Sequence, residues 1–327
     1  TEQSVLLNAV TAYMNLLRDT AILELQRSNV DVLQEQLRQA RQRLESGNVT
    51  ATDVSQAESR HAVGRTQVFG AQATYEGSRA VFRQVVGIEP TRLVAASPVD
   101  RFIPPGVGAA SATAVSHHPL VTSAQFNVDA AIMQVKVAEG ALYPTLVLQG
   151  TVQKNYEQSL NGYEAFQAAV TGQLSVPIYQ GGAEYAAIRQ AKETEGQRQL
   201  DFNVARDQVR ANFLQAWAQL QSAKSSIDST KSQVKAAEAA LNGVREEARL
   251  GQRTTLDVLN AQQELVSARI ALVSAQRDRV VNSYAVLAAV GRLSPQVLGL
   301  AVPIYDTTVH YHQVRDVWAG VRTPDGR

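Results

Sequence analysis

Histidine, serine and carboxylate side chains are the groups in this sequence that could bind a metal or perform catalysis. The five histidines are His61, His117, His118, His310 and His312. All but the first lie in a predicted loop and in the C-terminal tail, where no predicted helix would hold them in metal-ligand geometry. No serine has the Gly-x-Ser-x-Gly context of an activated nucleophile, and the sequence has no cysteine. We therefore predict no metal site, no cofactor and no catalytic residue.

A glycine-rich run and the overall charge exclude two further kinds of function. Residues 106–111, GVGAAS, lack the third glycine of a dinucleotide-binding loop, and Pro104 and Pro105 stand where a strand is required. The 31 Lys and Arg residues nearly balance the 30 Asp and Glu residues, for a net charge of +1. A balanced charge argues against nucleic-acid binding through bulk electrostatics.

The remaining polar motif occurs twice, which indicates a long internal repeat. Residues 46–54, SGNVTATDV, return 204 positions later as residues 250–258, LGQRTTLDV. The same offset relates many other residues without gaps, among them Ala12 and Ala216, Leu37 and Leu241, and Gly87 and Gly291. Each copy is predicted to be two helices joined at the glycine of the motif.

Both copies of the motif contain residues that end one helix and begin the next. Gly47 and Gly251 suit the left-handed conformation that terminates a helix. Asp53 and Asp257 fall in the first turn of the following helix, where the helix dipole favours a negative charge. The predicted capping residues are Thr50 or Thr52 in the first copy, and Thr254 or Thr255 in the second.

Apolar residues in the second copy follow a coiled-coil period. They alternate steps of four and three, with Thr230 as one polar interruption, at Val209, Phe213, Ala216, Leu220, Ala223, Ile227, Thr230, Val234, Ala237, Leu241 and Val244. No proline occurs between residues 183 and 294. Residues 184–248 are therefore predicted to form a single helix, about 100 Å long at a rise of ~1.5 Å per residue.

Two segments of about a dozen residues change to a period of two. In the first, Leu146, Leu148, Gly150 and Val152 alternate with Val147, Gln149, Thr151 and Gln153. In the second, Phe166, Ala168, Val170, Gly172 and Leu174 alternate with Gln167, Ala169, Thr171, Gln173 and Ser175. Two strands joined by a polar loop fit this pattern. The alternation alone leaves open whether they form a half-buried sheet in water or part of a membrane barrel.

The chain divides into six segments by these patterns. They are a first helical pair at 1–89, a proline-rich connector at 90–118, an amphipathic helix at 119–141, a β-hairpin at 142–180, a second helical pair at 181–292 and a C-terminal tail at 293–327. The fold class predicted is mainly α, with long antiparallel coiled-coil helices and one β-hairpin.

Several motifs together resemble the TolC family of outer-membrane efflux and secretion channels. They are the strand start Tyr143-Pro144-Thr145-Leu146, the hairpin end Pro177-Ile178-Tyr179-Gln180-Gly181-Gly182, and the Gly-x-x-Thr-x-x-Asp-Val reversal in two copies. The resemblance implies a homotrimer whose hairpins form a transmembrane β-barrel in outer-membrane lipid. It also implies that the long helices form an α-barrel across the periplasm, and that the tube carries substrates without transforming them.

The resemblance also implies roles for particular residues. Family members close the periplasmic end with polar links and acidic rings; the matching link residues here are Thr52, Asp53 and Arg253. Asp257 matches the outer acid of the pore, whereas Asn260 replaces the inner acid and Ala248 replaces a linking tyrosine, so a weaker gate is expected. The tips that would contact a periplasmic adaptor protein are Ser46, Gly47, Asn48, Leu250, Gly251 and Gln252. The residues that would face the barrel lumen are Gln149, Thr151, Gln153, Thr171 and Gln173.

One feature departs from the family pattern. Shifting the hairpin back by the repeat offset places its counterpart before Thr1. We therefore expect the first hairpin and its preceding helix to be missing, so that three copies of this chain would supply too few strands for the family's barrel.

Two functions from different classes are compatible with these patterns. The first is a passive exit duct of a tripartite efflux pump or type I secretion system, powered by an inner-membrane transporter. The second is a periplasmic adaptor or another coiled-coil interaction protein. Adaptors carry compact β-domains beside a single helical hairpin, whereas this sequence has an amphipathic β-hairpin directly before a very long helix.

Overall fold

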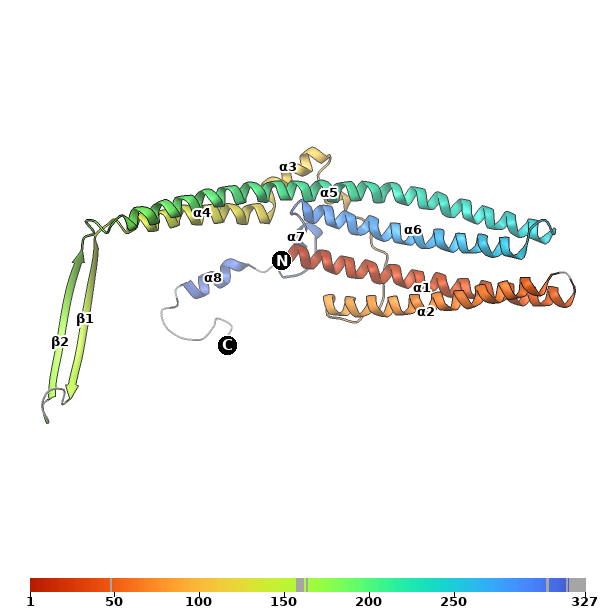
Figure 1. Ribbon diagram of the computed structural model, residues 1–327, viewed down its shortest axis with the longest axis horizontal. Coiled ribbons are helices and arrows are strands. Elements are labelled where there is room, and N and C mark those ends of the chain that lie inside the picture. The colour runs from red at the N-terminus through yellow and green to blue at the C-terminus, as the bar shows by residue number, and fades with distance from the viewer. Residues whose placement is uncertain (48, 157–161, 163, 304–305, 316, 318–327) are drawn as a thin grey trace. The chain divides into compact units, whose positions relative to one another are not determined.

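A computed structural model describes the whole chain except residues 48, 157–161, 163, 304–305, 316 and 318–327. The elements are α1 (Glu2–Glu45), α2 (Ala51–Val86), the 3-10 helix η1 (Asp100–Phe102), α3 (Val107–His117), α4 (Pro119–Gly140), β1 (Thr145–Tyr156), β2 (Glu164–Ser175), α5 (Ala183–Arg249), α6 (Thr255–Ala289), α7 (Pro295–Leu298) and α8 (Thr307–Arg315) (Figure 1). The prediction of a mainly helical fold with one β-hairpin is confirmed.

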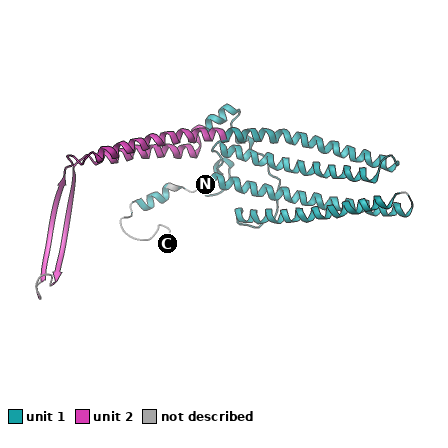
Figure 2. Ribbon diagram, viewed as in Figure 1, with its two compact units in different colours: residues 1–114, 212–327 teal, residues 115–211 magenta. Residues whose placement is uncertain are grey.

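The chain forms two compact units, whose boundaries differ from those of the six segments predicted from the sequence. The first unit comprises residues 1–114 and 212–327, and the second comprises residues 115–211 (Figure 2). Both predicted helical pairs contribute to the first unit because α6 packs against α1 as well as α5. Among the described residues, no helix has an apolar stretch long enough to cross a membrane.

Helix α5 is continuous over 67 residues, and its predicted seam is buried or partly buried at every position. Leu241 and Ala237 of this seam pack against Leu265 and Ala268 of α6. Small residues at alternate seam positions let the two helices approach closely. The period of 3.5 residues therefore corresponds to a real interface.

Most of the same seam positions are buried or partly buried in α1, but one of them is a buried acid. Asp19 is only 4% exposed, where the second copy has Ala223. Its carboxylate accepts hydrogen bonds from Arg18 Nε at 2.7 Å and from the Ser78 hydroxyl of α2. These partners supply the charge and hydrogen bonds that a buried carboxylate requires. The contact therefore pairs α1 and α2 at a defined position.

The connector between the copies is attached to three helices of the first unit. The Tyr13 hydroxyl of α1 bonds to both the N–H and the carbonyl of Val94, at 2.7 and 2.6 Å. The Val99 N–H donates to the buried hydroxyl of Ser283 on α6 at 3.1 Å. Asp100 forms ion pairs with Arg279 of α6 and Lys224 of α5. The segment therefore runs as a strap across α1, α5 and α6 and is not a free loop.

The second unit contains α4, the N-terminal part of α5 and the β-hairpin. Lys192 Nζ of α5 lies 3.7 Å from Glu139 Oε1 of α4. Strands β1 and β2 are antiparallel, and Thr145 pairs with Ser175 at one end of the ladder and Tyr156 with Glu164 at the other. Each strand is 12 residues long, and the ladder includes Asn155, Tyr156 and Glu164, which the sequence pattern placed in the polar loop between the strands.

Candidate functional site

The tip between α5 and α6 is built by a reciprocal capping arrangement. The Gly251 backbone has φ of +75°, and Thr254 is the N-cap of α6. The Thr254 hydroxyl accepts from the Asp257 N–H at 3.2 Å, and Asp257 Oδ2 accepts from the Thr254 N–H at 3.0 Å. Bonds from the Thr254 backbone and hydroxyl lower the pKa of Asp257, and Arg253 lowers it further.

The tip between α1 and α2 repeats this arrangement. Gly47 also has φ of +75°, and Asp53 Oδ2 accepts from the Thr50 N–H at 2.9 Å. Hydrogen bonds from Thr50 lower the pKa of Asp53 in the same way. Of the alternative capping residues, the structure selects Thr50 and Thr254; Thr52 is exposed in the first turn of α2.

Within the chain, the expected closing residues are not brought together. Arg253 Nε donates to Glu247 Oε2 at 2.9 Å, and the Asp53 carboxylate is held by Thr50. Each of these partners is local, because Arg253 lies in the turn before α6 and Asp53 in the first turn of α2. A link between Arg253 and Asp53 is thus not an intrachain contact here.

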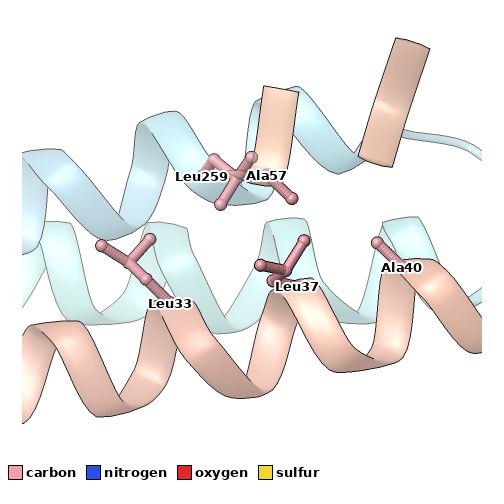
Figure 3. Close-up of a cluster of buried hydrophobic side chains, with 5 residues drawn as sticks. All are labelled: Leu33, Leu37, Ala40, Ala57 and Leu259. Atoms are coloured by element: carbon pink, nitrogen blue, oxygen red, sulfur yellow. The ribbon is translucent and has the colours of Figure 1, made fainter. Parts of the chain in front are cut away.

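Asn260 lies on a contact between the two helical pairs. Its Oδ1 accepts a hydrogen bond from Arg60 Nη2 of α2 at 2.8 Å. The adjacent Leu259 is 1% exposed and packs into an apolar cluster with Leu33, Leu37, Ala40 and Ala57 (Figure 3). Arg60 could not be identified from the sequence, since no local pattern distinguishes it from the other arginines of α2.

A buried polar layer follows one turn along α6. Gln262 Nε2 donates to Asn29 Oδ1 of α1 at 3.2 Å, and Arg245 Nη2 of α5 donates to Gln262 Oε1 at 3.0 Å. Asn29 and Gln262 are 3% and 7% exposed. The layer therefore joins α1, α5 and α6, and its two buried amides bond to protein groups in place of bulk water.

The tip residues predicted to contact an adaptor are exposed where the structure describes them. These are Ser46, Gly47, Leu250, Gly251 and Gln252; Asn48 lies outside the described residues. Leu250 is 65% exposed. The tips therefore present both backbone groups and one apolar side chain to solvent.

The β-hairpin has one polar and one apolar face. Cross-strand pairing aligns Gln149 with Thr171 and Val147 with Gln173 on one face, which also carries Thr151 and Gln153. The opposite face carries Leu146, Leu148, Val152, Phe166, Val170 and Leu174, all between 65% and 79% exposed. In water such a face would be costly, because each side chain is worth about 1.5 to 3 kcal/mol on burial.

Within the described part of the chain, no three His, Cys, Asp or Glu side chains gather as metal ligands would. What the arrangement offers is two exposed tips, a polar contact between helical pairs and a two-faced hairpin.

The family model for outer membrane efflux proteins matches residues 111–292. The full chain is 41% identical to the outer membrane efflux protein BepC of Brucella suis biovar 1 (strain 1330), over 72% of that protein.

This chain belongs to the outer membrane efflux protein family. Membership confirms the predicted resemblance and means that the protein is not an enzyme. Proteins of the outer membrane efflux family lie in the outer membrane and extend into the periplasm, and so does this one. Membership of this family excludes the alternative that the chain is a periplasmic adaptor protein.

This outer membrane efflux protein is also similar to two other bacterial proteins, one of them named for protease secretion. It is 26% identical to the outer membrane protein TolC of Escherichia coli (strain K12), over 91% of this chain and 63% of TolC. It is 28% identical to the alkaline protease secretion protein AprF of Pseudomonas aeruginosa, over 84% of this chain and 59% of AprF. The chain thus spans less than two thirds of the length of TolC and AprF.

Solved structures show the same fold for this family member. VceC of Vibrio cholerae has a TM-score of 0.71 at 22% identity, over 88% of this chain and 70% of VceC. The open state of the MtrE channel of Neisseria gonorrhoeae has a TM-score of 0.71 at 20% identity, over 90% of this chain and 67% of MtrE. The long helices and the hairpin are therefore the elements of a TolC-like channel.

Proposed function

We propose that this chain is part of the subunit of a homotrimeric, passive exit duct that crosses the outer membrane and serves a tripartite efflux pump or a type I secretion system. The observation that carries this proposal is the register of the β-hairpin. It places most of the large apolar side chains on one exposed face, and glutamine and threonine on the other, which also carries Val147. A barrel wall between lipid and water requires this division.

Closure into a barrel explains why the hairpin is stable in the membrane. A two-stranded ladder leaves backbone N–H and C=O groups unpaired along both outer edges. In lipid each unpaired group is costly, so the edges must bond to neighbouring strands. The lumen is then lined by Gln149, Thr151, Gln153, Thr171 and Gln173, and the apolar face contacts outer-membrane lipid.

The tips of the two helical pairs, between α1 and α2 and between α5 and α6, serve as the periplasmic entrance. Asp257 recurs three times around the axis of a trimer and favours entry of cations, with Asn260 beside it where a second acid is absent. Arg253, Thr52 and Asp53 contribute to closing the entrance through contacts between copies. The exposed tips bind a periplasmic adaptor protein, which couples the duct to an inner-membrane transporter.

Gene deletion tests this function and separates the two systems. If the duct serves an efflux pump, deletion increases sensitivity to toxic small molecules and the wild-type gene restores resistance. If it serves a type I system, deletion removes a protein from the culture medium instead. Unchanged sensitivity together with an unchanged set of secreted proteins would overturn the proposal.

A further inference from the structure

The two faces of the β-hairpin differ in charge as well as in polarity. In the ladder, odd-numbered residues pair with odd-numbered residues, as Gln149 does with Thr171, and even-numbered residues pair with even-numbered ones. Because successive side chains of a strand point to opposite sides, the polar face carries the odd-numbered set. The charged residues of β1 and β2 are Lys154 and Glu164, and both belong to the even-numbered set. Along the described length of both strands, the polar face therefore carries no charged side chain.

The two charges on the apolar face neutralise each other. Lys154 Nζ lies 3.2 Å from Glu164 Oε2 and 4.6 Å from the centroid of the Tyr156 ring. Tyr156 pairs with Glu164 in the last step of the ladder before the loop, so the ion pair lies at one end of the hairpin. Two opposite charges at this distance largely cancel at longer range. The ion pair therefore adds little to the electrostatic potential at the polar face.

The polar face is made of groups that serve cations and anions equally. Five of its side chains are amides, namely Gln149, Gln153, Asn155, Gln167 and Gln173. Its other side chains are those of threonine, serine, alanine and valine. Amides and hydroxyls each contain a hydrogen-bond donor and an acceptor. They also pair among themselves, since Gln153 Nε2 donates to Asn155 Oδ1 at 2.7 Å.

We infer that the barrel wall formed by this hairpin does not distinguish cationic from anionic cargo and accepts polar molecules of either sign. The inference rests on the proposed function for its premise that the polar face lines an aqueous lumen. Pores select ions by sign with rings of charged side chains, whose field is focused between low-dielectric walls. This face contributes no such ring. Selection by charge in the duct then depends on other parts, such as Asp257 at the entrance.

The class of cargo follows from the same observation. A wall with charged side chains would retain segments of opposite charge on a passing polypeptide and would exclude small ions of like charge. A wall of neutral amides and hydroxyls does neither. The cargo therefore includes polypeptides that carry both acidic and basic side chains, or small molecules of both signs.

The rate at which a thiol reacts with charged reagents measures the potential at one point of this wall. Thr151→Cys is introduced into a full-length subunit without other cysteines, and the protein is reconstituted in lipid vesicles. Three methanethiosulfonate reagents are compared, with a trimethylammonium, a sulfonate or a neutral group. Each rate is divided by the rate of the same reagent with a free thiol in solution. The ratio of the cationic to the anionic rate is expected to lie within about twofold of one at low ionic strength.

Charged variants show that the measurement would detect a charge on this face. Gln149 lies two residues from Thr151 on the same face, about 7 Å away. In the Thr151→Cys background, Gln149→Glu should raise the ratio and Gln149→Lys should lower it, each by roughly fivefold at low salt. The matched control is the double variant Lys154→Gln with Glu164→Gln, which removes the ion pair of the apolar face. It should leave the ratio unchanged.

The outcomes separate this inference from the proposed function. A ratio further from one than twofold, returning toward one as salt is added, would overturn the inference and leave the duct intact. A shift in the control variant as large as in the Gln149 variants would also overturn it, because the ion pair would then act on the lumen. If the thiol reacts with none of the three reagents, the polar face does not line an aqueous lumen and the proposed function itself is wrong.

Discussion

Asn260 of α6 and Arg60 of α2 lie 200 residues apart in sequence and are joined by a hydrogen bond of 2.8 Å between Arg60 Nη2 and Asn260 Oδ1. This bond places a guanidinium beside the position where the family has a second acid. We therefore expect Asn260→Asp to strengthen block of the channel by a polyvalent cation added from the periplasmic side. The effect should be larger together with Arg60→Gln, because Arg60 would otherwise pair with the new carboxylate.

Single-channel recording measures this block. Asp257→Ala should weaken the block and lower cation selectivity, since it removes three carboxylates from the entrance. If Asp257→Ala changes neither property, Asp257 acts only in the helix cap and does not face the pore.

Removing the Leu259 side chain should loosen the contact between helical pairs. Leu259→Ala leaves a cavity among Leu33, Leu37 and Ala57, and buried Leu→Ala changes cost about 2 to 5 kcal/mol. Leu256→Ala, at a 36% exposed position one turn away, is the control. The midpoint of thermal unfolding, followed by circular dichroism, should fall markedly only for Leu259→Ala. Equal shifts would show that the cluster does not stabilise the contact.

The cap of α2 should give a pH-dependent contribution to stability. The pKa of Asp53 is lowered from an unfolded value of 3.8, so the stabilisation is fully present above pH 3.8 and is lost as pH falls through the lower folded value. Thr50→Ala removes the cap and should cost about 1 kcal/mol at neutral pH. Hydrogen exchange at the start of α2 measures the effect. The difference from wild type should shrink in acid; a pH-independent difference would exclude the carboxylate's role.

Periodicity predicted the elements that depend on local burial. The seam of α5 and the two faces of the hairpin follow from spacing alone, since every residue of a given phase meets the same environment. The contacts of Arg60 with Asn260 and of Asn29 with Gln262 could not be predicted. They exist only after the two helical pairs, which are far apart in sequence, have packed together. The same holds for the strap, which the sequence predicts to be a proline-rich connector. Its backbone groups at Val94 and Val99 are bonded to Tyr13 and Ser283 only in the folded chain.

The two faces of the hairpin should respond oppositely to a charge. Leu148→Arg puts a guanidinium on the apolar face and should cost about 2 to 4 kcal/mol near the middle of the membrane. Gln149→Arg, one residue further, places the same group on the polar face and should be tolerated. The folded fraction in lipid vesicles measures both variants. An equal loss of the folded fraction in the two variants would mean that the apolar face does not differ from the polar face in its contact with lipid.

The most direct test of the duct is thiol accessibility along β1 in the membrane, in single-cysteine variants of residues 146–153 of the otherwise cysteine-free chain. Variants at 147, 149, 151 and 153 should react with a water-soluble maleimide. Those at 146, 148, 150 and 152 should resist it, and a fluorophore attached there before reconstitution should be quenched by brominated lipid. Uniform reactivity at all eight positions, or quenching without alternation, would contradict a hairpin that separates lipid from an aqueous lumen.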